Sequence, residues 1–200
     1  MAETHCKPDK RRAIIEAALD LIAANGFHGT PTSQIAAEAG VGTGSIYRYF
    51  KDKEDLIHQV FQHVADQISR AILRDRDPDA PLREQYLRLG FNTFYFMVKN
   101  PKIQAFNEQY FSSPFGVSHK REILVMDRTH RDAGDVPPVH GLLKSGRDQQ
   151  IIKDLPLGVL LALAFAPIVF VARDVSTGVL EMEPETVQKI IEACWDAIKR

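Results

Sequence analysis

The stretch GVGTGSIYRYF (residues 40–50) decides how the sequence is interpreted, because three glycines spaced two apart lie directly before two tyrosines. Glycine-rich runs of this kind occur both in loops that bind nucleotide phosphates and in tight turns between short helices. A phosphate-binding loop follows a strand, whereas the preceding residues PTSQIAAEA (31–39) have a helical pattern. The Walker pattern also requires a lysine after the glycines, and none occurs before Lys51. The stretch therefore predicts a turn between two helices.

The residues around this turn divide into an apolar set and a polar set. Gly40 can adopt the left-handed backbone that a tight turn requires. The apolar side chains expected to face a small core shared with the first helix are Ile35, Ala39, Val41, Ile46 and Phe50. A short helix with hydroxyls, an arginine and tyrosines on its outer side suits the major groove of DNA. The candidate DNA-binding residues are Thr32, Ser33, Thr43, Gly44, Ser45, Tyr47, Arg48, Tyr49 and Lys53.

The segment TPTSQIAAEAGVGTGSIYRYFKDKEDLI (30–57) combines the patterns I-A-x-x-A-G-V, G-x-x-Y-x-Y-F and K-x-x-L, and with them it resembles the TetR family of transcriptional regulators. The resemblance covers about residues 10–60, and Gly42 stands where family members often carry serine. It implies that Tyr47 contacts a DNA phosphate through its hydroxyl while its ring packs. It also implies a homodimer in which helices 157–176 and 184–199 pair with their symmetry mates.

Hydrophobic periodicity predicts an all-α chain in two parts. Residues 8–68 are expected to form an N-terminal helix-turn-helix DNA-binding domain, with the motif at 31–50. Its fourth helix leads into a larger helical domain over 69–200 for ligand binding and dimerisation. Thr30, Thr43 and Asp52 are expected to cap the second, third and fourth helices. Later helices are expected over 82–99, from 101 onward, around 119–131, and over 139–152, 157–176 and 184–199.

Composition and charge are those of an ordinary globular protein, with 44% hydrophobic residues, 26% charged residues and a net charge of −1. DNA binding must then depend on a local basic patch, which Lys53 and the run KPDKRR (7–12) supply. Cys6 and Cys194 lie far apart and have no metal-ligand spacing, which favours a reduced, cytoplasmic setting.

One uncharged segment, LPLGVLLALAFAPIVFVA (155–172), has 18 residues and reaches the length of a membrane span. Pro156, Gly158 and Pro167 interrupt it, and no basic cluster flanks it. A helix that is apolar all round is also what a soluble protein buries between its core and a partner subunit. We therefore expect no membrane insertion.

Aromatic residues gather in residues 91–115, which hold six of the eleven phenylalanines together with two tyrosines. The consecutive rings of residues 94–96 cannot all face one side of a helix. Two interpretations stay open: the rings line an apolar cavity for a small hydrophobic or aromatic ligand, or they form a solid core. The candidate ligand-binding residues are Phe91, Phe94, Tyr95, Phe106, Tyr110 and Phe111.

Catalytic and metal-binding patterns are weak in this sequence. His58 and His63 are five residues apart on one predicted helix, which turns their side chains about 140° away from each other. The nucleophile motif G-x-S-x-G and the zinc motif H-E-x-x-H do not occur. We therefore expect no enzyme activity, no metal and no cofactor.

Together, the sequence and the resemblance predict a repressor that a small hydrophobic ligand releases from a palindromic operator in double-stranded DNA. In a two-fold dimer, the recognition helices must lie about 34–36 Å apart to enter successive major grooves. A ligand that favours a wider spacing weakens DNA binding by the same coupling factor. The alternative is a ligand-independent DNA-binding protein with a solid helical core.

Overall fold

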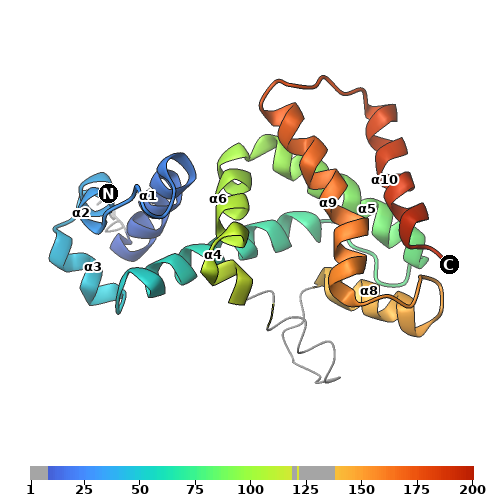
Figure 1. The fold of residues 1–200 in the computed structure, drawn as a ribbon, viewed down its shortest axis with the longest axis horizontal. Helices are drawn as coiled ribbons and strands as arrows, with labels where there is room; N and C mark the ends of the chain where they lie inside the picture. Colours follow the sequence, from blue (N-terminus) through green and yellow to red (C-terminus); the bar gives the residue numbers. More distant parts are fainter. Residues whose placement is uncertain (1–8, 119–120, 122–137) are drawn as a thin grey trace, which may run out of the picture.

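The computed structural model describes residues 9–118, 121 and 138–200, and within these ranges the chain is built of α-helices (Figure 1). The helices are α1 (Lys10–Asn25), α2 (Thr32–Glu38), α3 (Thr43–Tyr49), α4 (Lys53–Ile72), α5 (Leu82–Lys99), α6 (Pro101–Ser112), α8 (Pro138–Asp148), α9 (Leu157–Ser176) and α10 (Pro184–Ile198). This confirms the all-α class. The helix expected over 119–131 lies outside the described residues except at residue 121, and so do Cys6 and Lys7.

The helices form two groups joined by α4 (Figure 1). Helices α1, α2 and α3 lie together at one end, and we call them the head, together with the start of α4. At the other end α5 packs against α9 and α10, with α8 beneath α9. Helix α6 lies between these groups, against α1 on one side and α5 and α9 on the other. The arrangement places the predicted DNA-reading surface far from α9 and α10.

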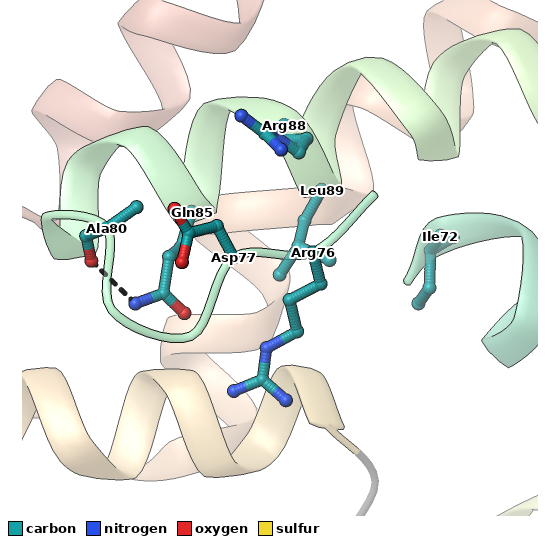
Figure 2. Close-up of a pocket in the computed structure, with 7 residues that line it drawn as sticks. All are labelled: Ile72, Arg76, Asp77, Ala80, Gln85, Arg88 and Leu89. Atoms are coloured by element: carbon teal, nitrogen blue, oxygen red, sulfur yellow. Dashed lines mark hydrogen bonds between the residues drawn. The ribbon is translucent and has the colours of Figure 1, made fainter. Parts of the chain in front are cut away.

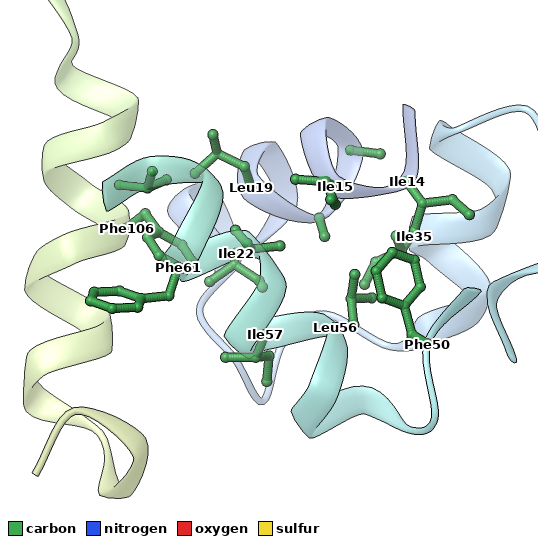
Figure 3. Packing of buried hydrophobic residues seen from close by; sticks show 14 of the residues in the cluster. Ile14, Ile15, Leu19, Ile22, Ile35, Phe50, Leu56, Ile57, Phe61 and Phe106 are labelled. Carbon is green, nitrogen blue, oxygen red and sulfur yellow. The ribbon is translucent and has the colours of Figure 1, made fainter. Parts of the chain in front are cut away.

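The head has its own apolar core, which confirms the predicted inward positions (Figure 3). Ile35, Ile46 and Phe50 are almost completely buried against α1, and Ala39 and Val41 are partly buried. This core extends beyond the head, because α6 contributes three further buried side chains. They are Ile103, Phe106 and Tyr110.

The helix ends of the head differ in part from those expected. Asp52 caps α4 as predicted, since its Oδ1 accepts a hydrogen bond from the Asp55 backbone N at 2.8 Å. Thr30 does not cap α2. It is fully buried, and its hydroxyl donates to the carbonyl oxygens of Leu21 (3.2 Å) and Gly26 (2.8 Å). A buried hydroxyl needs a hydrogen-bond partner, and these two carbonyls near the end of α1 provide it.

Two other helix ends also correct the sequence predictions. Thr43 is the first helical residue of α3, and the cap position belongs to Gly42, which makes no side-chain bond. Helix α8 ends at Asp148 instead of 152. The chain turns at Gln150 (φ 58°) so that Ile152 becomes buried and pairs with Lys199.

The second core is centred on α5. Gly90 allows α10 to approach closely, because a Cβ at this position would lie 2.6 Å from Cγ2 of Ile191. Tyr86 is fully buried, and its ring lies 5.2 Å from that of Trp195 and 5.5 Å from that of Phe165. Its hydroxyl donates to the backbone oxygen of Ala164 at 2.7 Å. A buried hydroxyl thus joins α5 to α9 with its hydrogen bond satisfied.

Helix α9 has the bounds predicted from the sequence, residues 157 to 176. It is the one helix within the described residues that is long and apolar enough to cross a membrane, and 22% of its most apolar window is buried. Its inward face is Leu160, Ala164, Ile168 and Ala172, which recur every four residues. The opposite face carries exposed apolar side chains at Val159 (43%), Leu163 (36%) and Phe170 (56%).

We predict that Tyr86→Phe lowers the free energy of unfolding by about 1–2 kcal/mol at pH 7, because the variant cannot form the hydrogen bond to Ala164. Burial, and to a smaller extent Cys194, raise the pKa of Tyr86 far above its usual value. The unfolded chain ionises near pH 10 while the folded chain does not, so wild-type stability falls above about pH 10. This fall should be smaller in the variant. Urea unfolding at pH 7 and pH 10.5 measures both effects.

The exposed Tyr95 is the control, and Tyr95→Phe should change the unfolding free energy by less than about 0.5 kcal/mol. Equal effects of the two substitutions would contradict the assigned role of the Tyr86 hydroxyl.

Candidate nucleic-acid interface

The turn between α2 and α3 has the geometry of a helix-turn-helix. Gly40 has φ 63°, in the left-handed region that favours glycine. The turn is closed by a hydrogen bond from the Val41 backbone N to the Ala36 backbone O at 2.9 Å. Ala36 is 1% exposed, and its small side chain lets α2 pass close to the neighbouring helices. The turn thereby fixes the direction of α3 relative to α2.

Helix α3 buries one residue of its own, Ile46, and directs the others outward. Tyr47 is 54% exposed and Tyr49 39%, although large aromatic rings are usually buried. A Cβ built at Gly44 meets no other atom within 4 Å, so this side of the helix is open. The exposed candidate residues of the head are Ser33, Thr43, Gly44, Tyr47, Arg48 and Tyr49, with Thr32 and Ser45 half-buried.

Two hydroxyls from different helices meet at this surface. The Thr32 Oγ1 and the Tyr47 hydroxyl are 3.3 Å apart and share a hydrogen bond, which joins the start of α2 to α3. The bond restrains the exposed Tyr47 ring and leaves acceptor and donor capacity on both oxygens. Two oriented hydroxyls on one surface are suited to phosphate oxygens, the groups that position a protein on a duplex.

Lys53 has a structural contact that the sequence did not indicate. Its Nζ donates to the backbone oxygen of Phe27 at 2.7 Å, and the side chain is half-buried. The bond anchors the first residue of α4 to the segment between α1 and α2. An ammonium group has three donors, so the remaining two can still reach a phosphate.

The basic run at the start of α1 is exposed at Lys10, Arg11 and Arg12, while Lys7 lies outside the described residues. Arg11 donates to Oε1 of Gln59 at 2.6 Å, and its guanidinium lies 5.6 Å from the centre of the Phe50 ring. This cation is therefore held beside the end of α3. Arg12 lies 3.9 Å from Glu16 in an exposed pair.

The candidate ligand-binding rings do not form one group. Phe106, Tyr110 and Phe111 belong to the head side of the molecule, where Tyr110 stacks on Phe61 with ring centres 4.1 Å apart. Phe91 and Phe94 pack on the second core, and Tyr95 is 41% exposed. The aromatic-rich segment thus contributes to both cores.

A hollow of about 440 Å³ lies elsewhere, between the α4–α5 loop and α8. Its walls include Arg76 and Leu142, which are distant in the sequence, so a local sequence pattern could not predict this hollow.

Among the described residues, no group of three His, Cys, Asp or Glu side chains could hold a metal ion. His63 instead lies 3.0 Å from Glu16 of α1.

The glycine turn, the outward polar face of α3 and the separate helical body define a helix-turn-helix DNA-binding protein. Residues 14–60 match the bacterial regulatory proteins of the tetR family, and residues 81–199 match the tetracyclin repressor-like C-terminal domain. The chain therefore belongs to the TetR family, whose members are transcription regulators and not enzymes.

Individual relatives agree with this assignment. An uncharacterized HTH-type transcriptional regulator of Haemophilus influenzae is 28% identical, covering 97% of this chain and 98% of its own. The HTH-type transcriptional repressor LfrR of Mycolicibacterium smegmatis is 32% identical over 68% of this chain and 73% of its own length. A solved TetR-family protein from Vibrio parahaemolyticus is 32% identical and superimposes with a TM-score of 0.76, covering 96% of this chain and 100% of that one.

We predict that two kinds of DNA contact can be separated by substitution. Tyr49→Ala and Lys53→Ala should weaken binding to all sequences and lower the salt dependence by about one phosphate contact each. Thr43→Ala and Arg48→Ala should instead change the preferred operator, because each good contact to a base edge discriminates by about 1–3 kcal/mol. Affinities for operator and random DNA, measured over a range of salt concentrations, distinguish the two classes.

Glu54→Ala, on the exposed first turn of α4, is the control and should not weaken binding. If all four variants bind like wild type, the outward face of α3 does not contact DNA.

Proposed function

We propose that the protein is a homodimeric repressor that binds a palindromic DNA operator and leaves it when a small hydrophobic ligand binds. The observation that carries the proposal is the exposed polar face of α3, presented by a helix-turn-helix in a family of transcription regulators. The name of the relative LfrR supports repression. Residues 8–68 act as the DNA-binding domain and residues 69–200 as the ligand-binding and dimerisation domain.

A second copy of the chain covers α9 in this proposal. The exposed side chains Val159, Leu163 and Phe170, with Ala162 and Ala166 between them, lie on one side of the helix. A continuous apolar stripe on a soluble protein marks a surface that is buried by association. A two-fold axis beside α9 buries the stripe against itself. The protein then works in the cytoplasm without a membrane.

Helix α10 takes part at the edge of this interface. Its apolar side is already buried within the chain, through Val187, Ile191 and Trp195. Its exposed side is mostly polar and includes Gln188, Lys189 and Asp196, which suits the rim of an interface rather than its centre. The pairing of 184–199 with its symmetry mate is thus a minor part of the proposed four-helix contact.

The ligand acts on the spacing of the two heads. Recognition helices about 34–36 Å apart enter successive major grooves, and a ligand that favours another spacing lowers operator affinity. We propose that it enters between α5 and α6 and reaches rings that belong to different groups in this structure: Phe91, Phe94 and Tyr95 on α5, and Phe106, Tyr110 and Phe111 on α6. Gln104 and Asn107 on α6 each have a buried amide oxygen without a hydrogen-bond partner among the described residues. These oxygens provide unpaired acceptors on α6.

The dimer can be tested together with the operator. Selection from random DNA should return a two-fold symmetric site with half-sites about one helical turn apart. Phe170→Asp places a charge in the apolar stripe, so the chain should elute as a monomer and bind the selected site about a hundredfold more weakly. Light scattering gives the mass and gel-shift titration the affinity.

Val179→Asp, at a 71% exposed position beyond the end of α9, is the matched control and should remain dimeric. A dimeric Phe170→Asp protein would show that the stripe is not the interface. Failure to enrich any DNA sequence would contradict operator binding itself.

The proposed ligand contact is tested at Phe106, which is fully buried beside Phe27 and Tyr110. Phe106→Ala should lower the unfolding free energy by about 3–5 kcal/mol, because a large buried ring is removed. If a ligand contacts these rings, the variant should also change the melting shift that hydrophobic compounds cause. Thermal melts of both proteins with a hydrophobic compound library measure this. A stability loss without any compound effect in either protein would support the ligand-independent alternative.

A further inference from the structure

The groove between the α4–α5 loop and α8 is separate from the rings discussed above. The groove is partly open to solvent and has a volume of about 440 Å³, which is in the range of small-molecule sites. One wall is formed by residues of the loop and the start of α5, and the other by α8 and the turn that follows it. Its apolar lining is Pro78, Ala80, Pro81, Leu82, Leu142 and Ile151.

The loop that forms one wall is held in place by side chains of α5. Asn92 Nδ2 donates to the backbone oxygens of Ile72 and Arg74, each at 3.0 Å. Gln85 Nε2 donates to the oxygens of Pro78 (3.0 Å) and Ala80 (2.8 Å), and the latter bond is drawn in Figure 2. A further bond joins the Arg88 guanidinium to the backbone oxygen of Asp75.

These bonds orient the wall before any ligand arrives, which reduces the entropy that binding would cost. The loop also contains Asp75 at φ 57°, a conformation that non-glycine residues adopt rarely. The surrounding bonds therefore hold the loop in one defined path.

Arg76 is the one charged residue among the described residues that line the groove. Its guanidinium has no hydrogen bond or ion pair within the described part of the chain, and it extends from the loop toward α8 (Figure 2). No ion pair joins it to the neighbouring Asp77, whose Oδ1 accepts a hydrogen bond from the backbone N of Asp79 at 3.0 Å. The N–H donors of a guanidinium pair with the two oxygens of a carboxylate, and the apolar side chains nearby can contact the rest of such a ligand.

We infer that this groove binds small carboxylates with an apolar body, with the carboxylate on Arg76 and the body against the proline and leucine side chains. A single guanidinium matches a single negative charge. Nucleoside diphosphates or triphosphates would bring several negative charges to a wall with one cation. The site does not depend on the proposed contact at the α5 and α6 rings.

A bound carboxylate would bridge two parts of the chain that are distant in sequence. Arg76 follows the C-terminal end of α4 by four residues, and the opposite wall belongs to α8. Because α4 carries the head at its other end, occupation of the groove restrains the helix that positions the recognition helix. A ligand in this groove could therefore affect DNA binding without entering the second core.

Calorimetric titration of the purified protein, without DNA, tests the inference with octanoate and phenylacetate as probes. The matched alcohols 1-octanol and 2-phenylethanol should bind at least about tenfold more weakly, because they lack the charge. The Arg76→Gln variant should bind both carboxylates about tenfold more weakly than wild type. Gly141→Leu should abolish binding, since a Cβ at Gly141 meets open space within the groove and a larger side chain fills it.

Arg74→Gln is the matched control, because Arg74 is an exposed arginine of the same loop that does not line the groove. It should retain affinity within about twofold. Circular dichroism melts verify that each variant folds. The inference is overturned if neither carboxylate binds wild type, or if binding survives unchanged in Arg76→Gln and Gly141→Leu. Operator release by other compounds is measured separately, so its failure would affect only the proposed function.

Discussion

The position of α6 is the constraint on which the rest of the structure depends. Its apolar side completes the head core through Phe106 and Tyr110. Its ends are bound to α1 by two polar contacts, between Lys102 and Asp20 at 2.6 Å and from Gln109 to the Ala23 oxygen at 3.1 Å. A close-packed interface of this kind tolerates little relative movement, so α6 and the head form one mechanical unit.

The contact of α6 with α9 is of a different kind. It includes a hydrogen bond from Gln104 to the Val169 oxygen at 2.9 Å and an ion pair between Glu108 and Arg173 at 3.7 Å. The ion pair is exposed, with 44% and 37% of the side chains accessible, and such pairs contribute about 0–1 kcal/mol. The seam between α6 and α9 is thus weaker than that between α6 and α1. A movement of the head relative to α9 would open this seam first.

Local patterns predicted the parts of the fold that local chemistry determines. Gly40 at a positive φ, Asp52 as a cap and the bounds of α9 all follow from short-range rules. The prediction that Thr30 caps α2 was wrong because its hydroxyl donates to carbonyl oxygens near the end of α1. The groove beside Arg76 was missed for the same reason, since its walls meet only in the folded chain. Both the hydrogen bonds of Thr30 and the groove depend on contacts between separate parts of the folded chain, and residue spacing alone does not predict such contacts.

Helix α3 contributes a single buried side chain, Ile46, and the turn behind it is fixed by Gly40 and Ala36. Apart from the hydrogen bond between Tyr47 and Thr32, the outward residues of α3 therefore contribute little to the stability of the fold. Substitutions there change the surface without reaching the stability threshold at which a protein is lost. If these residues contact DNA as proposed, two copies of this chain that arise by gene duplication would diverge in the sites they recognise within a few mutations, while the fold stays the same. The separation of recognition from stability makes the fold evolvable.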